Sequence, residues 1–495
     1  MRTLRKYFPV ILLVLILAVA AFFRFYRIRE YMTYLGDEGR DVLVVKRMLV
    51  DHKFTLLGPI TSVGSMYMGP VYYYLMAPFL WAWHFDPVGP AVMVVLFSLA
   101  TIYLIYRLGA RFFHPRVGLI ASFLYAISRL PIIHGRSSWN PNVVPFFAVL
   151  IIYSLMKIII EKKYRWFGIL GLALGILIQL HYVTMMFFPI IIACLFLIRF
   201  KAPIKYYCLG LITFLAGYSP FLIFELRHQF VNTQAVLRFL VQQKGESSST
   251  LLSVWQTITD VFVRLFWRLL VVENAELTKL FIAMLMVGIG LYWYRQRKKR
   301  NNLSAIKIII LWLTVGILSF GLYRGITYDY YFGSLFAVPF ILAGLFLYFI
   351  WNMDKFGKIC AVIIFLSLVF FNLKNSPLRI PPNNLLRNTE EISRFVFEKT
   401  GGQPYNFALI AGKNSDHAYR YFLEVWGNPP ITIENPVSDP QRSTVTNQLL
   451  VVCEEKICQP LGHSLWEIAG FGRAEIDGEW QVSTARVFRL VPYKI

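Results

Sequence analysis

The chain has 495 residues, of which 57% are apolar and 16% are charged, and its 50 basic and 27 acidic residues give a net charge of +23. Soluble domains average about 45–50% apolar and about 25% charged residues, so this composition excludes an ordinary water-soluble protein and favours a membrane protein with several spans. The positive charge alone would also suit a nucleic-acid-binding protein. The distribution of the charges along the chain decides between these two classes.

Apolar stretches that are long enough to cross a bilayer as helices, about 17–25 residues, recur along the chain. The first, residues 8–23, follows three basic residues, an opening that signal peptides share. It has no small-residue cleavage site after it, so we predict an uncleaved first transmembrane helix. Ten further spans are predicted at 88–106, 117–133, 143–160, 166–180, 183–197, 204–224, 280–293, 303–322, 332–350 and 359–373. The sequence therefore predicts an α-helical polytopic membrane protein with about 11 transmembrane helices.

The basic residues lie mostly in alternate loops between these spans. If the N-terminus is cytoplasmic, the N-terminal segment and the cytoplasmic loops hold 21 basic residues and only two acidic ones, Glu161 and Asp354. Cytoplasmic loops carry such an excess of Lys and Arg. The charge pattern therefore predicts a multi-pass protein of the cell (plasma) membrane with a cytoplasmic N-terminus, and it leaves no support for a nucleic-acid partner.

The same alternation places residues 374–495 outside the cytoplasm. Their composition changes abruptly, since Pro377, Pro381 and Pro382 interrupt the chain and the long apolar runs end. Helices are predicted at 384–399 and 416–426, and strands at 406–411, 448–453 and 486–491. We therefore expect a transmembrane domain at 1–373 and a small extracytoplasmic α/β domain at 374–495.

Two of the five cysteines, Cys453 and Cys458, lie in this outer segment. An oxidising compartment permits a disulfide between them, and a C-x4-C spacing across a turn can meet the distance requirement. Two unpaired thiols are the alternative. A zinc site is disfavoured because no second pair of ligands accompanies the two cysteines.

The longest outer loop of the membrane part, about 24–87, carries adjacent carboxylates at Asp37 and Glu38. One carboxylate can accept a proton from an acceptor hydroxyl while its neighbour binds a metal or the acceptor, and such general-base catalysis contributes about 10²–10⁴-fold. A solvated acid pair, or an N-cap for a helix that is predicted to reach about Asp51, is the structural alternative. The apolar run 71–83 is shorter than a span and is predicted to lie at the membrane interface.

Several short motifs follow one another in a specific order. They are Asp37-Glu38, Gly69-Pro70-Val71-Tyr72-Tyr73-Tyr74, the span end at 106–113, Gly118-Leu119-Ile120-Ala121 and Ser128-Arg129-Leu130-Pro131. This order resembles the family 39 glycosyltransferases of the GT-C fold, which include protein O-mannosyltransferases and lipid A aminoarabinose transferases, over about residues 9–200.

The resemblance implies a membrane glycosyltransferase for cell-envelope glycoconjugate synthesis. Such an enzyme moves a sugar from a dolichyl- or undecaprenyl-phosphate donor to a lipid, glycan or protein acceptor on the extracytoplasmic face. It also implies that Asp37 acts as the base or orients the acceptor, with Glu38 as its neighbour. The donor phosphate, which leaves with negative charge, then needs a cationic partner.

Three candidates for donor binding come from two polar segments. Arg40 lies one helical turn after Asp37 and matches an arginine of the aminoarabinose transferase motif. Arg136 and Asn140 lie in a polar segment, 134–142, at the outer end of two spans. There Arg136 is suited to bind phosphate and Asn140 to hold sugar hydroxyls. Snorkelling of Arg136 to head groups and a simple helix-start turn at Asn140 are the structural alternatives.

Two further candidates lie in other outer turns. His181 lies at a position that resembles one where relatives carry a lysine near the donor phosphate, and a histidine there would make the charge depend on pH. A packed, hydrogen-bonded histidine is the alternative. Arg324 precedes a tyrosine-rich turn, 328–331, that is suited to lipid phosphate or sugar stacking. An aromatic belt at the membrane surface, which explains these tyrosines without a function, is the alternative.

The chain departs from the aminoarabinose transferases at one motif, because Met68-Gly69-Pro70 replaces a charged Glu-Lys before the proline. The sugar, the acceptor and a divalent metal as cofactor are therefore left open. Two other functions compete with the glycosyltransferase. A lipid-linked glycan flippase or transporter would commonly show repeated halves, and none is evident here. An O-antigen ligase-like protein would not need Asp37.

Overall fold

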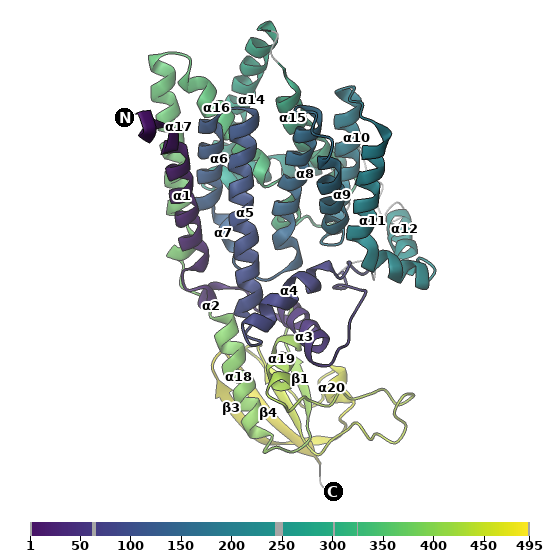
Figure 1. Cartoon of the computed structure of the whole chain (residues 1–495). Helices are drawn as coiled ribbons and strands as arrows, with labels where there is room; N and C mark the ends of the chain where they lie inside the picture. Colours follow the sequence, from purple (N-terminus) through teal and green to yellow (C-terminus); the bar gives the residue numbers. More distant parts are fainter. Residues whose placement is uncertain (1, 62–65, 243–250, 300–301, 324, 494–495) are drawn as a thin grey trace. The chain divides into compact units, whose positions relative to one another are not determined.

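The computed structural model describes residues 2–61, 66–242, 251–299, 302–323 and 325–493. The chain divides into two compact units, and each unit combines separate stretches of sequence (Figure 1). Unit 1 contains Met1–Tyr26, Thr55–Leu75 and Val92–Pro381, and unit 2 contains Arg27–Phe54, Met76–Ala91 and Pro382–Ile495. The segment that carries Asp37 therefore belongs to the same compact unit as the C-terminal domain. A domain boundary at residue 373 stays a prediction.

Unit 1 is a bundle of helices, many of which run side by side in Figure 1. Within it, α9 packs against α8 and α11, and α6 packs against α1 and α16. Its α-helices include α1 (Arg2–Phe25), α6 (Pro115–Ile127), α7 (Arg129–His134), α8 (Val144–Ile159), α9 (Trp166–Leu177), α10 (Phe187–Leu197), α11 (Ile204–Arg227), α12 (Val231–Gln242), α14 (Ala275–Lys298), α15 (Ser304–Phe320), α16 (Ala337–Trp351) and α17 (Lys355–Lys374). Short 3-10 turns connect some of them, namely η1 (Asn140–Val143), η2 (Tyr182–Met186), η4 (Asp329–Leu335) and η5 (Pro377–Arg379). Two helices, α4 (Val71–Ala82) and α5 (Val88–Phe112), each contribute residues to both units.

Six of the described helices are long and apolar enough to cross a membrane. A seventh span results if η4 and α16, which meet at a bend of 57°, are counted together. Four shorter apolar helices, at 115–127, 166–177, 182–197 and 304–320, coincide with other predicted spans. The helical membrane-protein fold is thus confirmed, and the number of eleven spans stays a prediction. The run 71–83 forms α4, which has 12 residues and at 1.5 Å per residue is too short to cross a bilayer.

One segment differs from the sequence-based expectation. The predicted spans 204–224 and 280–293 leave the residues between them in a long outer loop, but residues 251–271 of that loop form α13 (Leu251–Phe266) and a π-helical turn, η3 (Trp267–Val271). Buried side chains at Val261, Leu265 and Leu269 explain why this segment packs as a helix. The polar sequence of residues 245–249 in the same loop predicts a flexible tip or lid segment, and these residues lie outside the described ones.

The C-terminal part of unit 2 is an α/β domain. Its elements are α18 (Leu385–Lys399), β1 (Asn406–Ile410), α19 (His417–Val425), β2 (Leu449–Cys453), α20 (Trp466–Ala469), β3 (Ala474–Val482) and β4 (Ala485–Pro492). The sheet has the order β1-β2-β4-β3, with β1 parallel to β2 and the other pairs antiparallel. The predicted α/β domain is confirmed; β3 and α20 were not predicted.

The two faces of this sheet carry separate apolar cores. Alternate residues of β1 and β2 point to opposite faces, so Phe407 and Leu450 pack in one core and Ala408 and Val451 in the other. Helices α18 and α19 contribute to the first core, and α20 to the second. Complete burial of β1 and β2 on both faces explains their continuous apolar sequence.

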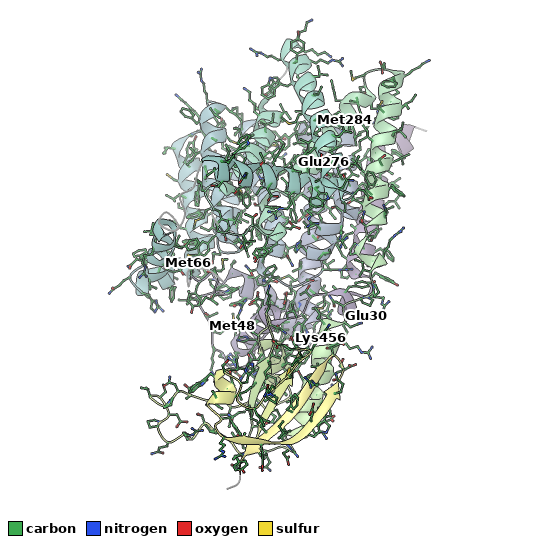
Figure 2. The ribbon with its side chains drawn as sticks, turned by 180° about the vertical axis from the view of Figure 1, so that it is seen from behind. Glu30, Met48, Met66, Glu276, Met284 and Lys456 are labelled. Atoms are coloured by element: carbon green, nitrogen blue, oxygen red, sulfur yellow. A yellow bond between two sulfur atoms is a disulfide. The ribbon has the colours of Figure 1, made fainter. Side chains whose placement is uncertain are left out.

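A disulfide closes the loop that follows β2. Cys453 is bonded to Cys458, with Cα atoms 6.3 Å apart. Lys456 lies in the loop between the two cysteines and is labelled in Figure 2. The bond therefore fixes the chain where it leaves the carboxyl end of β2.

Candidate active site

The two adjacent carboxylates occupy the first turn of α3 (Gly36–Val50), a helix of unit 2. Acidic side chains are favoured there because they face the positive end of the helix dipole. The backbone N–H of Leu35 donates to Glu38 Oε2 at 3.0 Å, which is the return bond of a capping box. Glu38 thus has a structural role at the start of α3.

Asp37 and Glu38 differ in their exposure to solvent. The side chain of Asp37 is 54% exposed, whereas Glu38 is only 6% exposed. Arg40 Nη1 donates to Asp37 Oδ1 at 2.8 Å, and Arg40 Nη2 donates to Asp41 Oδ1 at 2.8 Å. Because Asp41 is fully buried, Arg40 links the exposed carboxylate to the interior of the unit. Asp37 is therefore the carboxylate that an acceptor can reach.

The pKa of the Glu38 carboxyl group lies near neutral pH. The pKa of Glu38 is raised to about 7, mainly by burial and in smaller part by the negative charges of Asp37 and Asp41, while hydrogen bonds from the backbone N–H groups of Leu35 and Glu38 act to lower it. Close to pH 7 the Glu38 carboxyl group is therefore protonated in a substantial fraction of molecules.

The loop after β1 borders the N-terminus of α3. The backbone N–H of Gly36 donates to Asn414 Oδ1 at 2.9 Å, and Ser415 Oγ lies 2.9 Å from His417 Nδ1. Burial lowers the pKa of His417, and Arg40 is among the charges that also lower it, against Asp416, which raises it. Sequence reasoning missed this loop. The sequence feature that indicates this loop is a polar run directly after a buried strand, at the carboxyl end of the strand, where α/β sheets commonly bind ligands.

A second group of candidates meets in unit 1. Asn140 Nδ2 donates to the backbone oxygen of Leu180 at 2.6 Å, so the polar segment 134–142 is joined to the turn that carries His181. The His181 ring lies 4.9 Å from the ring of Tyr331 and 5.9 Å from that of Tyr330. The structure thus brings Asn140 and His181 together with the predicted tyrosine-rich turn.

Arg136 lies in the same polar segment as Asn140. It is 3% exposed, which contradicts the snorkelling alternative because a snorkelling side chain reaches the head groups. The neighbouring Ser138 Oγ lies 2.8 Å from Tyr72 Oη, a residue of the Gly69-Pro70 motif. This polar segment is therefore part of the interior of unit 1.

His181 does not replace a lysine electrostatically. It lies in the turn between α9 and η2, and burial lowers its pKa to about 4. The imidazole is therefore neutral at neutral pH, and its aromatic contacts dominate. The same turn packs closely on the Gly69-Pro70 motif, since a Cβ on Gly69 would lie 2.3 Å from Gln179 Cγ. This contact explains the glycine of that motif.

Arg324 lies outside the described residues, but two other arginines reach the turn that follows it. Arg268 Nε lies 3.1 Å from Asp329 Oδ2, and Arg264 Nε lies 3.8 Å from Asp329 Oδ1. Both arginines belong to the segment 251–271, and sequence reasoning missed them because it treated that segment as a loop. Throughout the described part of the chain, no group of three or more His, Cys, Asp or Glu side chains is arranged to hold a metal ion.

Comparison with known proteins identifies the fold. ArnT from Cupriavidus metallidurans, in its complex with undecaprenyl phosphate, is similar over 96% of this chain and 97% of its own, with a TM-score of 0.62 and 12% identity. The chain has the GT-C fold. The oligosaccharyltransferase of Archaeoglobus fulgidus in its apo form is similar over 94% of this chain and 71% of its own, with a TM-score of 0.55 and 14% identity. A structure of that enzyme with Zn and sulfate gives a TM-score of 0.53 at 14% identity, over 89% of this chain and 67% of its own.

A family profile supports the same resemblance within the sequence. Residues 68–224 match the family described as dolichyl-phosphate-mannose-protein mannosyltransferase. No curated protein matches the chain. The matched region contains Gly69-Pro70, Arg136, Asn140 and His181, whereas Asp37 precedes it. The predicted resemblance to GT-C glycosyltransferases is therefore confirmed, and the roles of individual residues stay predictions.

Proposed function

We propose that this protein is a membrane glycosyltransferase that moves a sugar from a polyprenyl-phosphate donor to an acceptor at the extracytoplasmic face of the plasma membrane. The similarity to ArnT with undecaprenyl phosphate, over nearly the whole of both chains, supports the donor class. The observation that carries the proposal is the exposed carboxylate of Asp37 at the start of α3, held by the Arg40 guanidinium.

In this reaction Asp37 is the general base. It accepts the proton of the acceptor hydroxyl while the acceptor oxygen attacks the anomeric carbon. The bond between that carbon and the phosphate oxygen breaks, and the electron pair leaves with the lipid phosphate. A single displacement of this kind inverts the configuration at the anomeric carbon, and the proton ends on Asp37.

The leaving phosphate needs positive charge, and guanidinium groups bind phosphate oxygens in bidentate fashion. Arg40 in unit 2 and Arg136 in unit 1 are therefore each proposed as a donor-binding cation. Asn140 is proposed to bind donor sugar hydroxyls, and His181 to bind the donor through its ring. A divalent cation would also neutralise the phosphate. The described residues form no group of three or more His, Cys, Asp or Glu side chains that would hold one.

The proposed orientation places the C-terminal α/β domain outside the cytoplasm. The 21 basic residues of the predicted cytoplasmic segments support it, and so does the Cys453–Cys458 disulfide, since disulfides persist in oxidising compartments. Protease treatment of intact cells is expected to cleave the C-terminal domain and to leave an N-terminal tag intact.

The decisive experiment is transfer from radiolabelled polyprenyl-phosphate sugars in membranes that contain equal amounts of wild type or Asp37→Asn. Asp477→Asn is a matched control, since Asp477 is also an exposed aspartate of unit 2 paired with an arginine, Arg489. We expect label to move to a new product with wild type and the control, and to remain on the lipid with Asp37→Asn. Movement of lipid-linked glycan across the bilayer without transfer would instead support the flippase or transporter. Transfer that persists in Asp37→Asn would support a ligase-like reaction.

A further inference from the structure

We infer that the C-terminal α/β domain positions the catalytic carboxylate, with Asn414 and Glu424 as its positioning residues. The inference rests on the proposed function and adds a role for residues that lie more than 370 positions after Asp37. Helix α3 packs along α19 within unit 2 (Figure 1). Three contacts fix α3, two of them in its first turn and one near its C-terminal end.

The first contact holds the N-terminus of α3. Asn414 Oδ1 accepts the backbone N–H of Gly36, the residue before Asp37, at 2.9 Å. Asn414 Nδ2 donates to Glu454 Oε1 at 2.8 Å, and Glu454 also accepts the hydroxyl of Tyr419 at 2.7 Å. The amide of Asn414 is therefore oriented from its other side by Glu454, the residue after β2, which Tyr419 of α19 holds in turn, and it presents its oxygen to the first turn of α3.

The second contact brings the two helix backbones together. A Cβ on Gly39 would lie 2.3 Å from Ala418 Cα and 2.8 Å from Ala418 Cβ. Because these are backbone and short side-chain atoms, no flexible group can move away. A glycine at this place allows α3 to approach α19 so closely that the helix cannot shift sideways without separating from it.

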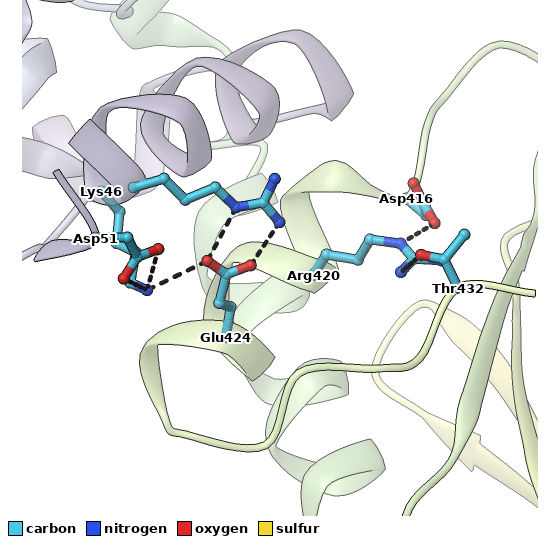
Figure 3. A network of polar contacts seen from close by, with 7 residues as sticks. Lys46, Asp51, Asp416, Arg420, Glu424 and Thr432 are labelled. Carbon is cyan, nitrogen blue, oxygen red and sulfur yellow. Dashed lines mark hydrogen bonds and ion pairs between the residues drawn. The ribbon is translucent and has the colours of Figure 1, made fainter. Parts of the chain in front are cut away.

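The third contact holds the C-terminal part of α3 (Figure 3). Arg47 donates two hydrogen bonds to the carboxylate of Glu424, with Nε to Oε1 at 3.1 Å and Nη2 to Oε2 at 2.7 Å. Lys46 Nζ donates to Glu424 Oε1 at 3.2 Å. The Glu424 side chain is only 13% exposed, whereas that of Arg47 is 45% exposed, so the carboxylate of this pair is shielded from solvent and the guanidinium lies at the surface. A two-point contact of this kind also fixes the rotation of α3 about its axis.

The segment that leads into α3 is fixed to the same domain. Arg29 bridges Asp86 and Glu390 at 2.5 Å each, and the backbone N–H of Asn384 donates to the oxygen of Glu30 at 2.9 Å. Asp37 is thus carried by a helix that is held on both sides by one folded domain. Displacement of a reacting group by about 1 Å can lower a rate about 10²-fold, so these contacts determine the rate of the chemical step.

The test compares purified full-length variants at matched amounts of monodisperse enzyme. Glu424→Gln removes the negative charge and keeps the size of the side chain. Asn414→Ala removes the side-chain oxygen that accepts the backbone N–H of Gly36. Glu391→Gln is the control, because Glu391 also pairs with an arginine, on the exposed face of α18. We expect kcat to fall tenfold or more in the first two variants, with KM for donor and acceptor within twofold of wild type. The control is expected to keep both constants.

Two further measurements separate positioning from folding. Hydrogen exchange of the α3 amides is expected to accelerate in Glu424→Gln, while the sheet amides keep their protection. The charge swap Arg47→Glu with Glu424→Arg is expected to recover most of the lost kcat. An unchanged kcat in both variants would overturn the inference, and so would a raised acceptor KM at unchanged kcat, which would assign acceptor capture to the domain. Absence of transfer by wild type would refute the proposed function itself.

Discussion

Replacement of Glu38 by Gln is expected to stabilise the protein increasingly as the pH rises. In the folded protein the pKa of Glu38 is about 7, compared with an ordinary value of 4.5. The folded state therefore binds the proton more tightly than the unfolded state, and stability is lost as the pH rises from 4.5 through 7. At 1.36 kcal/mol per pKa unit, this shift lowers the free energy of unfolding by about 3 kcal/mol above pH 7. Between pH 5 and pH 8 the expected change is roughly 2–3 kcal/mol.

Glutamine removes the titration and keeps the capping bond, because its side-chain oxygen can still accept the N–H of Leu35. Thermal unfolding of purified wild type and Glu38→Gln is to be followed in detergent at several pH values. The difference in Tm is expected to grow by roughly 5–10 °C from pH 5 to pH 8, at about 2–4 °C per kcal/mol for a unit of this size. Glu391→Gln, an exposed control, is expected to show no such trend. A pH-independent difference for Glu38→Gln would refute the argument that burial raises the pKa.

Three further outcomes are expected. Arg40→Lys keeps the charge but loses the planar fork that binds two carboxylates, so transfer from labelled donor is expected to slow about tenfold or more; wild-type rates would contradict its role. Replacement of both Cys453 and Cys458 by serine is expected to lower the free energy of unfolding by about 2 kcal/mol, as the short loop between them implies. It is also expected to abolish any effect of reductant on Tm. Asn140→Ala removes the hydrogen-bond donor to the buried backbone oxygen of Leu180 and is expected to lower the free energy of unfolding by about 1–3 kcal/mol. An unchanged Tm would argue against this contact.

Much of the fold could be predicted because its signals are local. A long apolar run predicts a spanning helix wherever it occurs, and the alternation of charged loops then orders the helices. The strands β1 and β2 were found from short apolar runs. The helix α13 was missed because its apolar residues lie along one face and alternate with polar ones. A search for continuous apolar runs does not detect such a helix.

The candidate site was predicted only in part, for a related reason. Asp37, Glu38 and Arg40 stand next to one another in the sequence, and a motif shows them directly. Their different roles follow from direction, since adjacent residues of a helix point about 100° apart, and this directs Glu38 inward and Asp37 outward. Which residues face α3 depends on contacts across the chain, as at Glu424, and a sequence taken alone gives no such pairing.

The discontinuity of unit 2 has a consequence for biosynthesis. The inward face of α3, formed by Val42, Val45 and Met48, leaves the ribosome early, yet α19, against which α3 packs, is made only near the end of translation. All the predicted spans are inserted in the meantime. The nascent protein therefore carries an unpartnered apolar helix until its last domain has folded, and acquires its complete catalytic turn only then. Chains released before residue 417 are expected to occupy the membrane without activity and to be favoured substrates for quality-control proteases.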